Sequence, residues 1–340
     1  SRKTRSRSGQ SEPFLRTTTP MRNPFRVFVG DAIIWAELFL YNRRSSAFWS
    51  SNLVCLAFYT VVLTVISPFA ILLIVGHSLR TLTDPSPRSK RSPIIPRTLA
   101  HPSVRVATYN VQGGVGMDGV HDIDRTRRCI VEECNSPDIV GLQEVELHSS
   151  LHEGDMVADL AGDAYPHHRF IFTRALRGGE YGIAMLSKHP ILEERVLSYP
   201  GWPRRNPRKA LALRLHPTQW PAPRWFVVTH FQNDPTGLEQ EEEAELLLEF
   251  VAELRLSAEV VLMGDFNLPR MFRAWKRLAH VLVTVEQQAC GTIPADRPRI
   301  RIDHVLSSAP LVEGYTERVV PSISSDHRPV VVDLPWPLES

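Results

Sequence analysis

Short apolar runs recur along the chain from residue 103 onward, and they are dense in Val, Ile and Leu. Such runs are typical of strands that are buried on both faces of a sheet. Apolar residues at helical spacing lie between some of these runs and predict helices over 126–135 and 239–256. We therefore expect one folded α/β domain over residues 103–336. The predicted strands are 104–111, 138–145, 182–187, 209–215, 225–231, 259–266, 300–306 and 329–334.

Polar residues stand at the ends of several predicted strands, in four short strings. The strings are Thr-Tyr-Asn-Val at 108–111, Leu-Gln-Glu-Val at 142–145, Gly-Asp-Phe-Asn at 264–267 and Ser-Asp-His-Arg-Pro at 325–329. A scaffold gathers one site from distant segments by placing polar groups where its strands end. Carboxylate and amide oxygens suit a hard cation such as Mg²⁺. His230 and His327 add general acid and base capacity.

The N-terminal part of the chain predicts attachment to a membrane. Residues 1–24 are rich in Ser, Thr and Arg and predict a disordered basic leader. In the region 25–79, residues 25–41 predict an interfacial helix, because charges interrupt an apolar run. Residues 53–76 hold no charge over 24 positions, which is enough to cross a bilayer as a helix. A buried core helix is the alternative for that run, and a linker rich in Pro, Ser and Arg follows at 80–102.

Charge is distributed unevenly along the chain. Residues 1–102 carry 14 Lys/Arg and 4 Asp/Glu, whereas residues 103–336 carry 25 Lys/Arg and 32 Asp/Glu. A basic leader beside an apolar span suits an anionic membrane surface, so membrane lipids are the expected partner. The acidic domain matches a long polyphosphate poorly, which makes nucleic acid the less favoured substrate. More positive residues follow the span than precede it, so we expect a cytoplasmic catalytic domain, with a single pass or a shallow hairpin both open.

Taken together and in order, the motifs of the domain resemble the endonuclease/exonuclease/phosphatase superfamily. Each string alone is a weak signal, and the specificity lies in the complete set across essentially all of residues 103–334. The matching pieces are Ala107-Thr-Tyr-Asn110, Leu142-Gln-Glu144-Val145, Gly182-Ile-Ala-Met-Leu-Ser187, Thr229-His230, Gly264-Asp-Phe-Asn267, Arg301-Ile-Asp303-His304 and Ser325-Asp326-His327. The resemblance implies a four-layered α/β sandwich, two mixed β-sheets flanked by helices. It also implies a divalent-metal phosphodiesterase or phosphatase that uses Mg²⁺, with Mn²⁺ as the alternative.

The resemblance also assigns roles near the metal and the attacking water. Glu144 resembles the principal metal ligand, and Asn110 beside it holds metal or phosphate. Asp326 resembles a further carboxylate on the metal side. Asp265 resembles the group that orients or deprotonates the water, and Asn267 resembles a donor to a phosphate oxygen.

A second set of roles concerns protons and the substrate. His327 resembles the catalytic imidazole, with Asp303 bonded to its other nitrogen. His230 resembles the second histidine, which contacts phosphate or protonates the leaving oxygen. Arg208 and Lys209 stand at the family's substrate-side position, although a solvated strand end explains them equally well. These groups fit the needs of phosphate-ester cleavage: neutralised charge, an activated water and a protonated leaving oxygen.

Three functions stay open at this point. The first is a membrane-tethered phosphodiesterase acting on a phospholipid or sphingolipid headgroup, because the layout of the chain looks like that of membrane-bound neutral sphingomyelinases. Residues 231–234 read Phe-Gln-Asn-Asp and lack the second histidine and the Ala-Pro of many sphingomyelinases, which puts choline-lipid specificity in doubt. The second function is a nuclease with the same metal site, and the third is a non-catalytic membrane scaffold. Specificity is expected in the loops 112–124 and 199–208.

Overall fold

A computed structural model describes residues 103–200, 206–287, 290–311 and 314–335. The predicted leader, interfacial helix, membrane span and linker, all within residues 1–102, lie outside the described residues. Within the described ranges, no helix combines the length and the apolar character that crossing a bilayer requires. The first described strand begins at Ser103.

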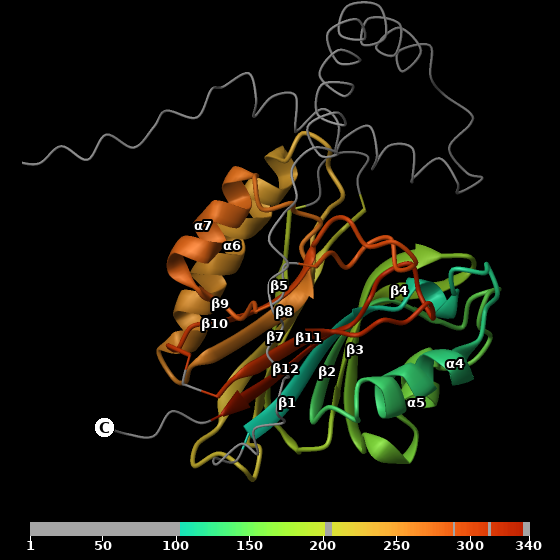
Figure 1. Ribbon diagram of the computed structural model, residues 1–340, viewed down its shortest axis with the longest axis horizontal. Helices are drawn as coiled ribbons and strands as arrows, with labels where there is room; N and C mark the ends of the chain where they lie inside the picture. Colours follow the sequence, from blue (N-terminus) through green and yellow to red (C-terminus); the bar gives the residue numbers. More distant parts are fainter. Residues whose placement is uncertain (1–102, 201–205, 288–289, 312–313, 336–340) are drawn as a thin grey trace, which may run out of the picture. The chain divides into compact units, whose positions relative to one another are not determined.

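Six strands form the first of two mixed sheets (Figure 1). Their spatial order is β11-β12-β1-β2-β4-β3. Only the central neighbours β1 and β2 run parallel, and the other pairs are antiparallel. The strands are β1 (Ser103–Asn110), β2 (Ile139–Leu147), β3 (His167–Leu176), β4 (Gly179–Ser187), β11 (Thr316–Val319) and β12 (Val330–Pro335).

The second sheet repeats this plan with the spatial order β5-β6-β7-β8-β10-β9. Again only the central neighbours, β7 and β8, run parallel. The strands are β5 (Ile191–Ser198), β6 (Lys209–Leu215), β7 (Arg224–His230), β8 (Val260–Asp265), β9 (Val283–Thr284) and β10 (Asp303–Ser307).

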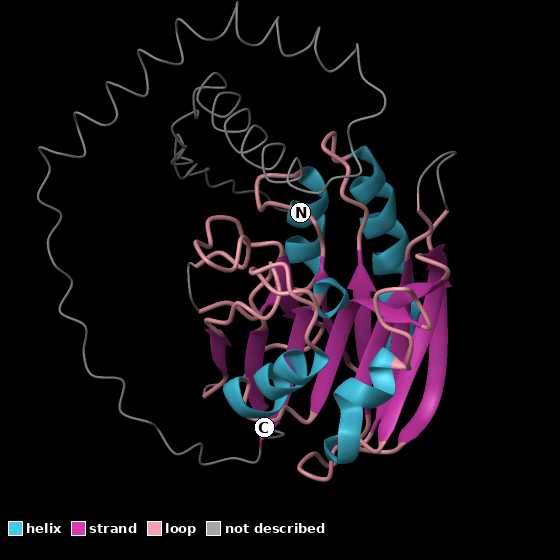
Figure 2. Ribbon diagram, turned by 90° about the vertical axis from the view of Figure 1, so that its right-hand side faces the viewer, coloured by secondary structure: helices cyan, strands magenta, loops and turns pink. Residues whose placement is uncertain are grey.

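Helices cover the outer face of each sheet and complete four layers (Figures 1 and 2). The first sheet carries α4 (Ile123–Arg128), the π-helical turn η3 (Cys129–Glu133) and α5 (Met156–Ala161). The second sheet carries α6 (Leu238–Arg255) and α7 (Arg273–Val281). Two short 3₁₀ turns, η2 (Gln112–Gly114) and η4 (Gly162–Ala164), lie in connections. The predicted α/β sandwich of two mixed sheets flanked by helices is confirmed.

The alternation of side chains along the buried strands explains the layering. In β7, Phe226 and Val228 pack between the two sheets, whereas Trp225 and Val227 pack beneath the helices of the second sheet. Both faces of such a strand are apolar, which is why its sequence reads as a continuous apolar run. Each large side chain buried in this way contributes roughly 1.5–3 kcal/mol, so the apolar layers hold the strand ends in fixed positions.

Several elements differ from the sequence-based expectation for physical reasons. The edge strands β3 and β5 were not predicted, because much of their length is exposed and they lack a continuous apolar run. The first predicted helix, 126–135, begins earlier, since Asp122 caps it by accepting a hydrogen bond from the Arg125 backbone N–H at 2.8 Å. The predicted helix 239–256 is confirmed within one residue at each end.

Candidate active site

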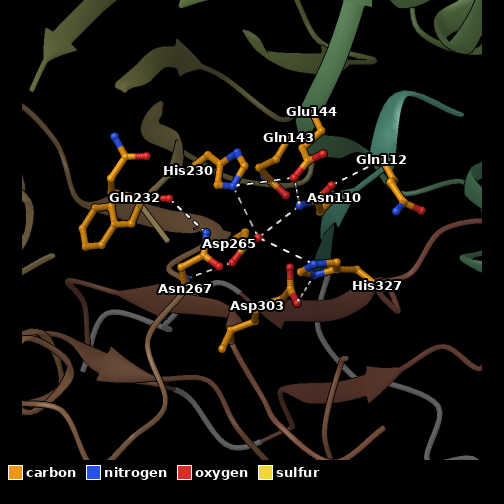
Figure 3. A network of polar contacts seen from close by, with 12 residues as sticks. Asn110, Gln112, Gln143, Glu144, His230, Gln232, Asp265, Asn267, Asp303 and His327 are labelled. Atoms are coloured by element: carbon orange, nitrogen blue, oxygen red, sulfur yellow. Dashed lines mark hydrogen bonds and ion pairs between the residues drawn. The ribbon is translucent and has the colours of Figure 1, made fainter. Parts of the chain in front are cut away.

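The ends of the central strands of both sheets meet at one edge of the sandwich (Figure 3). Asn110, His230 and Asp265 are the last residues of β1, β7 and β8. Asp303 begins β10 and lies opposite Asp265, because β10 runs antiparallel to β8. His327 precedes β12, which is antiparallel to β1, so it reaches the same edge. The topology thus brings together residues that lie far apart in the sequence.

Glu144 owes its position to a β-bulge in β2. The pairing of β2 with β4 shifts between Gln143 and Val145, so Glu144 is the extra residue. Its φ of +60° lies in the left-handed region, which a non-glycine residue adopts only at a cost. A bulge re-aims a side chain, and here it turns the carboxylate toward the other strand ends. The Glu144 side chain stays 32% exposed, so it is the accessible carboxylate of the cluster.

Asn110 joins the two sheets through its side-chain amide. Its Nδ2 donates to Oε1 of Glu144 at 3.0 Å and to Oδ2 of Asp265, also at 3.0 Å. Its Oδ1 accepts from the backbone N–H of Gln112 at 3.1 Å. Ser325 adds a further tie by donating its hydroxyl to the Asn110 carbonyl at 2.7 Å. The residue is therefore a rigid bridge between two carboxylates that would otherwise repel each other.

Asp265, Asp303 and His327 form a buried acid–imidazole group. Nδ1 of His327 donates to Oδ2 of Asp303 at 2.8 Å, and its Nε2 lies 3.8 Å from Oδ2 of Asp265. Burial lowers the pKa of His327, but the carboxylates of Asp303 and Asp265 outweigh it and raise the pKa well above its usual range. Burial, followed by the charge of Asp303, raises the pKa of Asp265 to about 7. The group thus holds a cationic imidazole beside a carboxyl that exchanges protons near neutral pH.

His230 is held in the opposite, neutral state. Its Nδ1 lies 2.9 Å from Nη1 of Arg208, which always carries hydrogen and therefore makes Nδ1 the acceptor. Nε2 then carries the proton and lies 3.5 Å from Oδ2 of Asp265. Burial, followed by the charge of Arg208, lowers the pKa of His230 well below its usual value. Arg208 is itself fixed by donating Nε to Oε1 of Gln232 at 3.2 Å.

The site offers two places where a divalent cation could lie. Asp265, Asp303 and His327 have ligand atoms within 4.8 Å of one another, but hydrogen bonds to Asn110 and within the group already occupy several of these atoms. Oε2 of Glu144, in contrast, accepts no hydrogen bond from the described residues. Burial, followed by the charge of Asp326, raises the pKa of Glu144. An accessible oxygen of Glu144 with the second carboxylate of Asp326 nearby fits a cation at Glu144.

The remaining sequence-based candidates fall in different places. Asn267 lies in the site with a φ of +48°, but its Nδ2 donates to the Phe231 carbonyl at 3.0 Å, and its amide oxygen accepts no hydrogen bond from the described residues. Arg208 belongs to the site, as the contact with His230 shows. Lys209 begins β6 and makes no hydrogen bond or ion pair with the site residues among those described. Of the two basic residues, Arg208 therefore faces the site and Lys209 makes no such contact with it.

Two neighbours of the site were not assigned to it from the sequence. Burial raises the pKa of Tyr181, and the charge of nearby Glu144 is the second cause. The ring of Tyr181 in turn carries the guanidinium of Arg174, with Cζ 4.4 Å from the ring centroid. Tyr181 stands directly before the Gly182 motif, which was the available signal. Arg174 lies in the unpredicted strand β3 and had none.

Comparisons with known proteins agree with this geometry. The profile of the Endonuclease/Exonuclease/phosphatase family matches residues 107–327. No curated protein sequence matches the chain at the significance required.

Solved structures share the fold at low sequence identity. An endonuclease/exonuclease/phosphatase from Beutenbergia cavernae is 24% identical with a TM-score of 0.56, and the match covers 69% of this chain and 72% of that one. A mannosyl-6-phosphatase from Bacteroides thetaiotaomicron is 20% identical with a TM-score of 0.55, covering 69% and 100%. The catalytic domain of human Nocturnin is 19% identical with a TM-score of 0.55, covering 72% and 98%.

Proposed function

The chain belongs to the endonuclease/exonuclease/phosphatase family, and we propose that it is a divalent-metal-dependent hydrolase that cleaves a phosphodiester by attack of water. One observation carries the proposal: a buried Asp303–His327 pair faces Asp265 beside the accessible carboxylate of Glu144. A purely structural scaffold has no use for such an arrangement, because burying several ionisable groups together is costly. The retained set therefore speaks against the non-catalytic alternative.

Glu144, with Asn110 and Asp326 beside it, would hold Mg²⁺ or Mn²⁺. The bound cation would neutralise charge on the phosphoryl oxygens as the transition state forms. The donor set fits, since Glu144 and Asp326 offer carboxylate oxygens and one oxygen of Glu144 is uncommitted among the described residues. Asn110 orients the Glu144 carboxylate by donating its Nδ2 to Oε1.

The other residues divide the proton chemistry. Asp265, with its pKa raised to about 7, orients the water and takes its proton. His327 presents a charged Nε2–H to the phosphoryl oxygens, while Asp303 fixes the ring by accepting from Nδ1. His230 presents a neutral Nε2–H, fixed by Arg208, to a phosphoryl or leaving oxygen. The site thus surrounds one carboxylate base with two oriented hydrogen-bond donors.

The decisive experiment compares hydrolysis with and without metal on a panel of esters. Wild-type protein and the Asp265→Asn variant are tested with Mg²⁺ on a soluble phosphodiester, a phosphomonoester and DNA. We expect the diester to be cleaved, chelation to abolish turnover, and the Asp265→Asn variant to lose roughly 10²–10⁴-fold, as for a general base. Undiminished turnover in excess EDTA would rule the proposal out. Preference for DNA would instead support the nuclease alternative.

We further propose that the substrate lies in or near a membrane and is a phospholipid or sphingolipid. The support is the uncharged run 53–76 and the basic surplus of residues 1–102 in the sequence. A protein starting at residue 103 should keep its activity on a soluble diester and lose it mainly on bilayers, because tethering raises the effective concentration. Full-length protein should resist alkaline carbonate extraction; release by salt alone would mean that the attachment is electrostatic.

A further inference from the structure

Arg174 reaches the edge of the active site through a second β-bulge. The pairing of β3 with β4 shifts between Phe172 and Arg174, so Thr173 is the extra residue. In a regular strand Arg174 would share the outer face of Phe172, but the bulge pairs it with Tyr181 instead. Thr173 fixes the bulge by donating its hydroxyl to the Tyr181 carbonyl at 2.8 Å. The arginine therefore lies on the face that the two sheets share.

The bulges of β2 and β3 occur at the same level of the sheet. Both interrupt pairing at Gly182 of β4, which stands between them. A Cβ at Gly182 would lie 2.0 Å from the Ile171 carbonyl oxygen, so only glycine allows this close approach. One bulge presents Glu144 and the other presents Arg174. The sheet thus delivers an acidic and a basic side chain to neighbouring positions by the same device.

Arg174 differs from Arg208 in having no polar partner among the residues that the structure describes. Arg208 is engaged by His230 and Gln232. Arg174 makes no hydrogen bond or ion pair with any described residue, and its contact is the face of the Tyr181 ring. Its Nε is buried and has no acceptor. Its two Nη groups also have no acceptor among the described residues and are not among the buried unpaired atoms, so an incoming anion would pair with them.

The charge of Arg174 is felt inside the site. After burial, Arg208 and His327, it contributes to lowering the pKa of His230. It also opposes the rise in the pKa of Tyr181 that burial and the charge of Glu144 cause. Yet a single scissile phosphoryl group already faces Arg208, His327 and the expected cation. A further cation over the Tyr181 ring, unpaired among the described residues, exceeds what one phosphoryl group requires.

We propose that Arg174 binds a second anionic group of the substrate, such as a phosphoryl group close to the scissile phosphodiester. The proposal rests on the proposed function and narrows its substrate class. A planar guanidinium stacked on an aromatic ring keeps its donor edge free for a phosphate or carboxylate. The same charge repels a quaternary ammonium, so a choline headgroup is disfavoured. The source of the second group is a multiply phosphorylated headgroup or a soluble bisphosphate.

The test uses two soluble diesters with the same scissile bond. Ethyl 4-nitrophenyl phosphate carries no second anion, and its analogue with a phosphoryl group on the ethyl chain carries one. We expect wild-type protein to prefer the phosphorylated ester by about tenfold or more in kcat/KM, as for a charged hydrogen bond. Arg174→Met should bring the ratio close to one, mainly through KM. Arg174→Lys should keep part of the preference, which a merely structural role would not do.

The matched control is Arg169→Gln, on the same strand but paired with Glu194 at 3.0 Å on the exposed surface. It removes the same charge and should leave the ratio unchanged. Equal losses on both esters in Arg174→Met, or no preference in wild-type protein, would overturn the proposal.

A binding measurement separates this inference from the proposed function. Calorimetry with ethyl phosphate and with ethylene glycol bisphosphate, in Mg²⁺, should show tighter binding of the bisphosphate that Arg174→Met abolishes. If neither ester is hydrolysed but this difference persists, the hydrolase proposal fails and the anion site stands. If the esters are hydrolysed but no difference is found, the anion site fails alone. Vesicles bearing singly or multiply phosphorylated headgroups, compared by the same variants, distinguish the lipid from the soluble source.

Discussion

The two sheets supply unlike halves of the active site, although each ends its parallel pair at the same edge. The first sheet supplies Glu144, whose side chain is 32% exposed. The second supplies His230 and Asp265, whose side chains are 2% and 1% exposed, together with buried Asp303. His327, which precedes β12 of the first sheet, is also buried and joins this group through its bond to Asp303. An accessible carboxylate suits a cation exchanged with solvent, whereas Asp265 is closed off from solvent and has its pKa raised to about 7, which suits proton transfer. The difference in burial separates metal binding from proton chemistry.

Breaking the accessible half should have the largest effect. Glu144→Gln keeps the size and the acceptor for Asn110 but removes the charge that the cation requires. We expect kcat/KM to fall roughly 10³-fold or more, since the metal supplies several kcal/mol of transition-state stabilisation. Raising Mg²⁺ should rescue the variant only slightly. Full recovery at high Mg²⁺ would show that another residue holds the metal, with the Asp265–Asp303–His327 group as the next candidate.

Breaking the buried half should show that its members act as a unit. His327→Ala and Asp303→Ala should each lower turnover by roughly 10²–10⁴-fold, because the Asp303 carboxylate orients the imidazole through its Nδ1. The double variant should lose little more than either single one, since groups sharing one role are non-additive. Multiplicative losses in a double-mutant cycle would show that the two residues work separately.

Variants of the neighbouring residues Arg208 and Lys209 test which basic residue belongs to the buried half. Arg208→Met removes the donor to His230 and should lower kcat/KM roughly 10- to 100-fold, as loss of a charge-assisted hydrogen bond does. Its charge also lowers the pKa of His230, so the variant's His230 should become protonated at a higher pH, which NMR titration of the imidazole detects. Lys209→Met is the adjacent control and should alter neither quantity.

The sequence revealed the strand-end residues because the ends of buried apolar runs can be read directly. Glu144, Asp265 and His327 follow from that logic and from the order of the motifs, and so does the sandwich of two mixed sheets. Positions set by strand irregularities could not be read. The bulges that aim Glu144 and Arg174 insert one residue each, and no residue type announces them. The edge strands β3 and β5 escaped for a related reason, since half-exposed edges lack the apolar density that marks buried strands.

The hydrogen-bond partners of the site residues could not be predicted from the sequence either. Arg208 was a candidate, but its role became specific only with the contact to His230. Lys209 seemed equivalent to it, but among the described residues only Arg208, directly before β6, hydrogen-bonds to residues of the site. Tyr181 lies beside the site because β4 pairs with both bulged strands, β2 and β3. A single sequence does not reveal this order of strands.

The smallest effect on turnover is expected at Glu243, which supports the buried half from α6. Its Oε2 accepts from the backbone N–H of Gln232 at 2.9 Å, and Gln232 in turn holds Arg208. Burial raises the pKa of Glu243 from 4.5 to about 8. Between those values the folded protein keeps a proton that the unfolded chain releases, so stability must fall as pH rises through this window.

Glu243→Gln should remove this part of the pH dependence, because glutamine keeps an acceptor oxygen and cannot ionise. Relative to wild-type protein, the variant should gain on the order of 3–5 kcal/mol of stability between pH 5 and pH 8, measured by urea unfolding. Glu249→Gln, on the exposed face of the same helix, is the control and should follow the wild-type curve. Parallel curves for wild type and Glu243→Gln would mean that Glu243 is charged in the folded protein. The buried half would then contain an ionised carboxylate next to Gln232. Burial alone would not keep a carboxyl group neutral at that position, and the contrast between the two halves would not extend to Glu243.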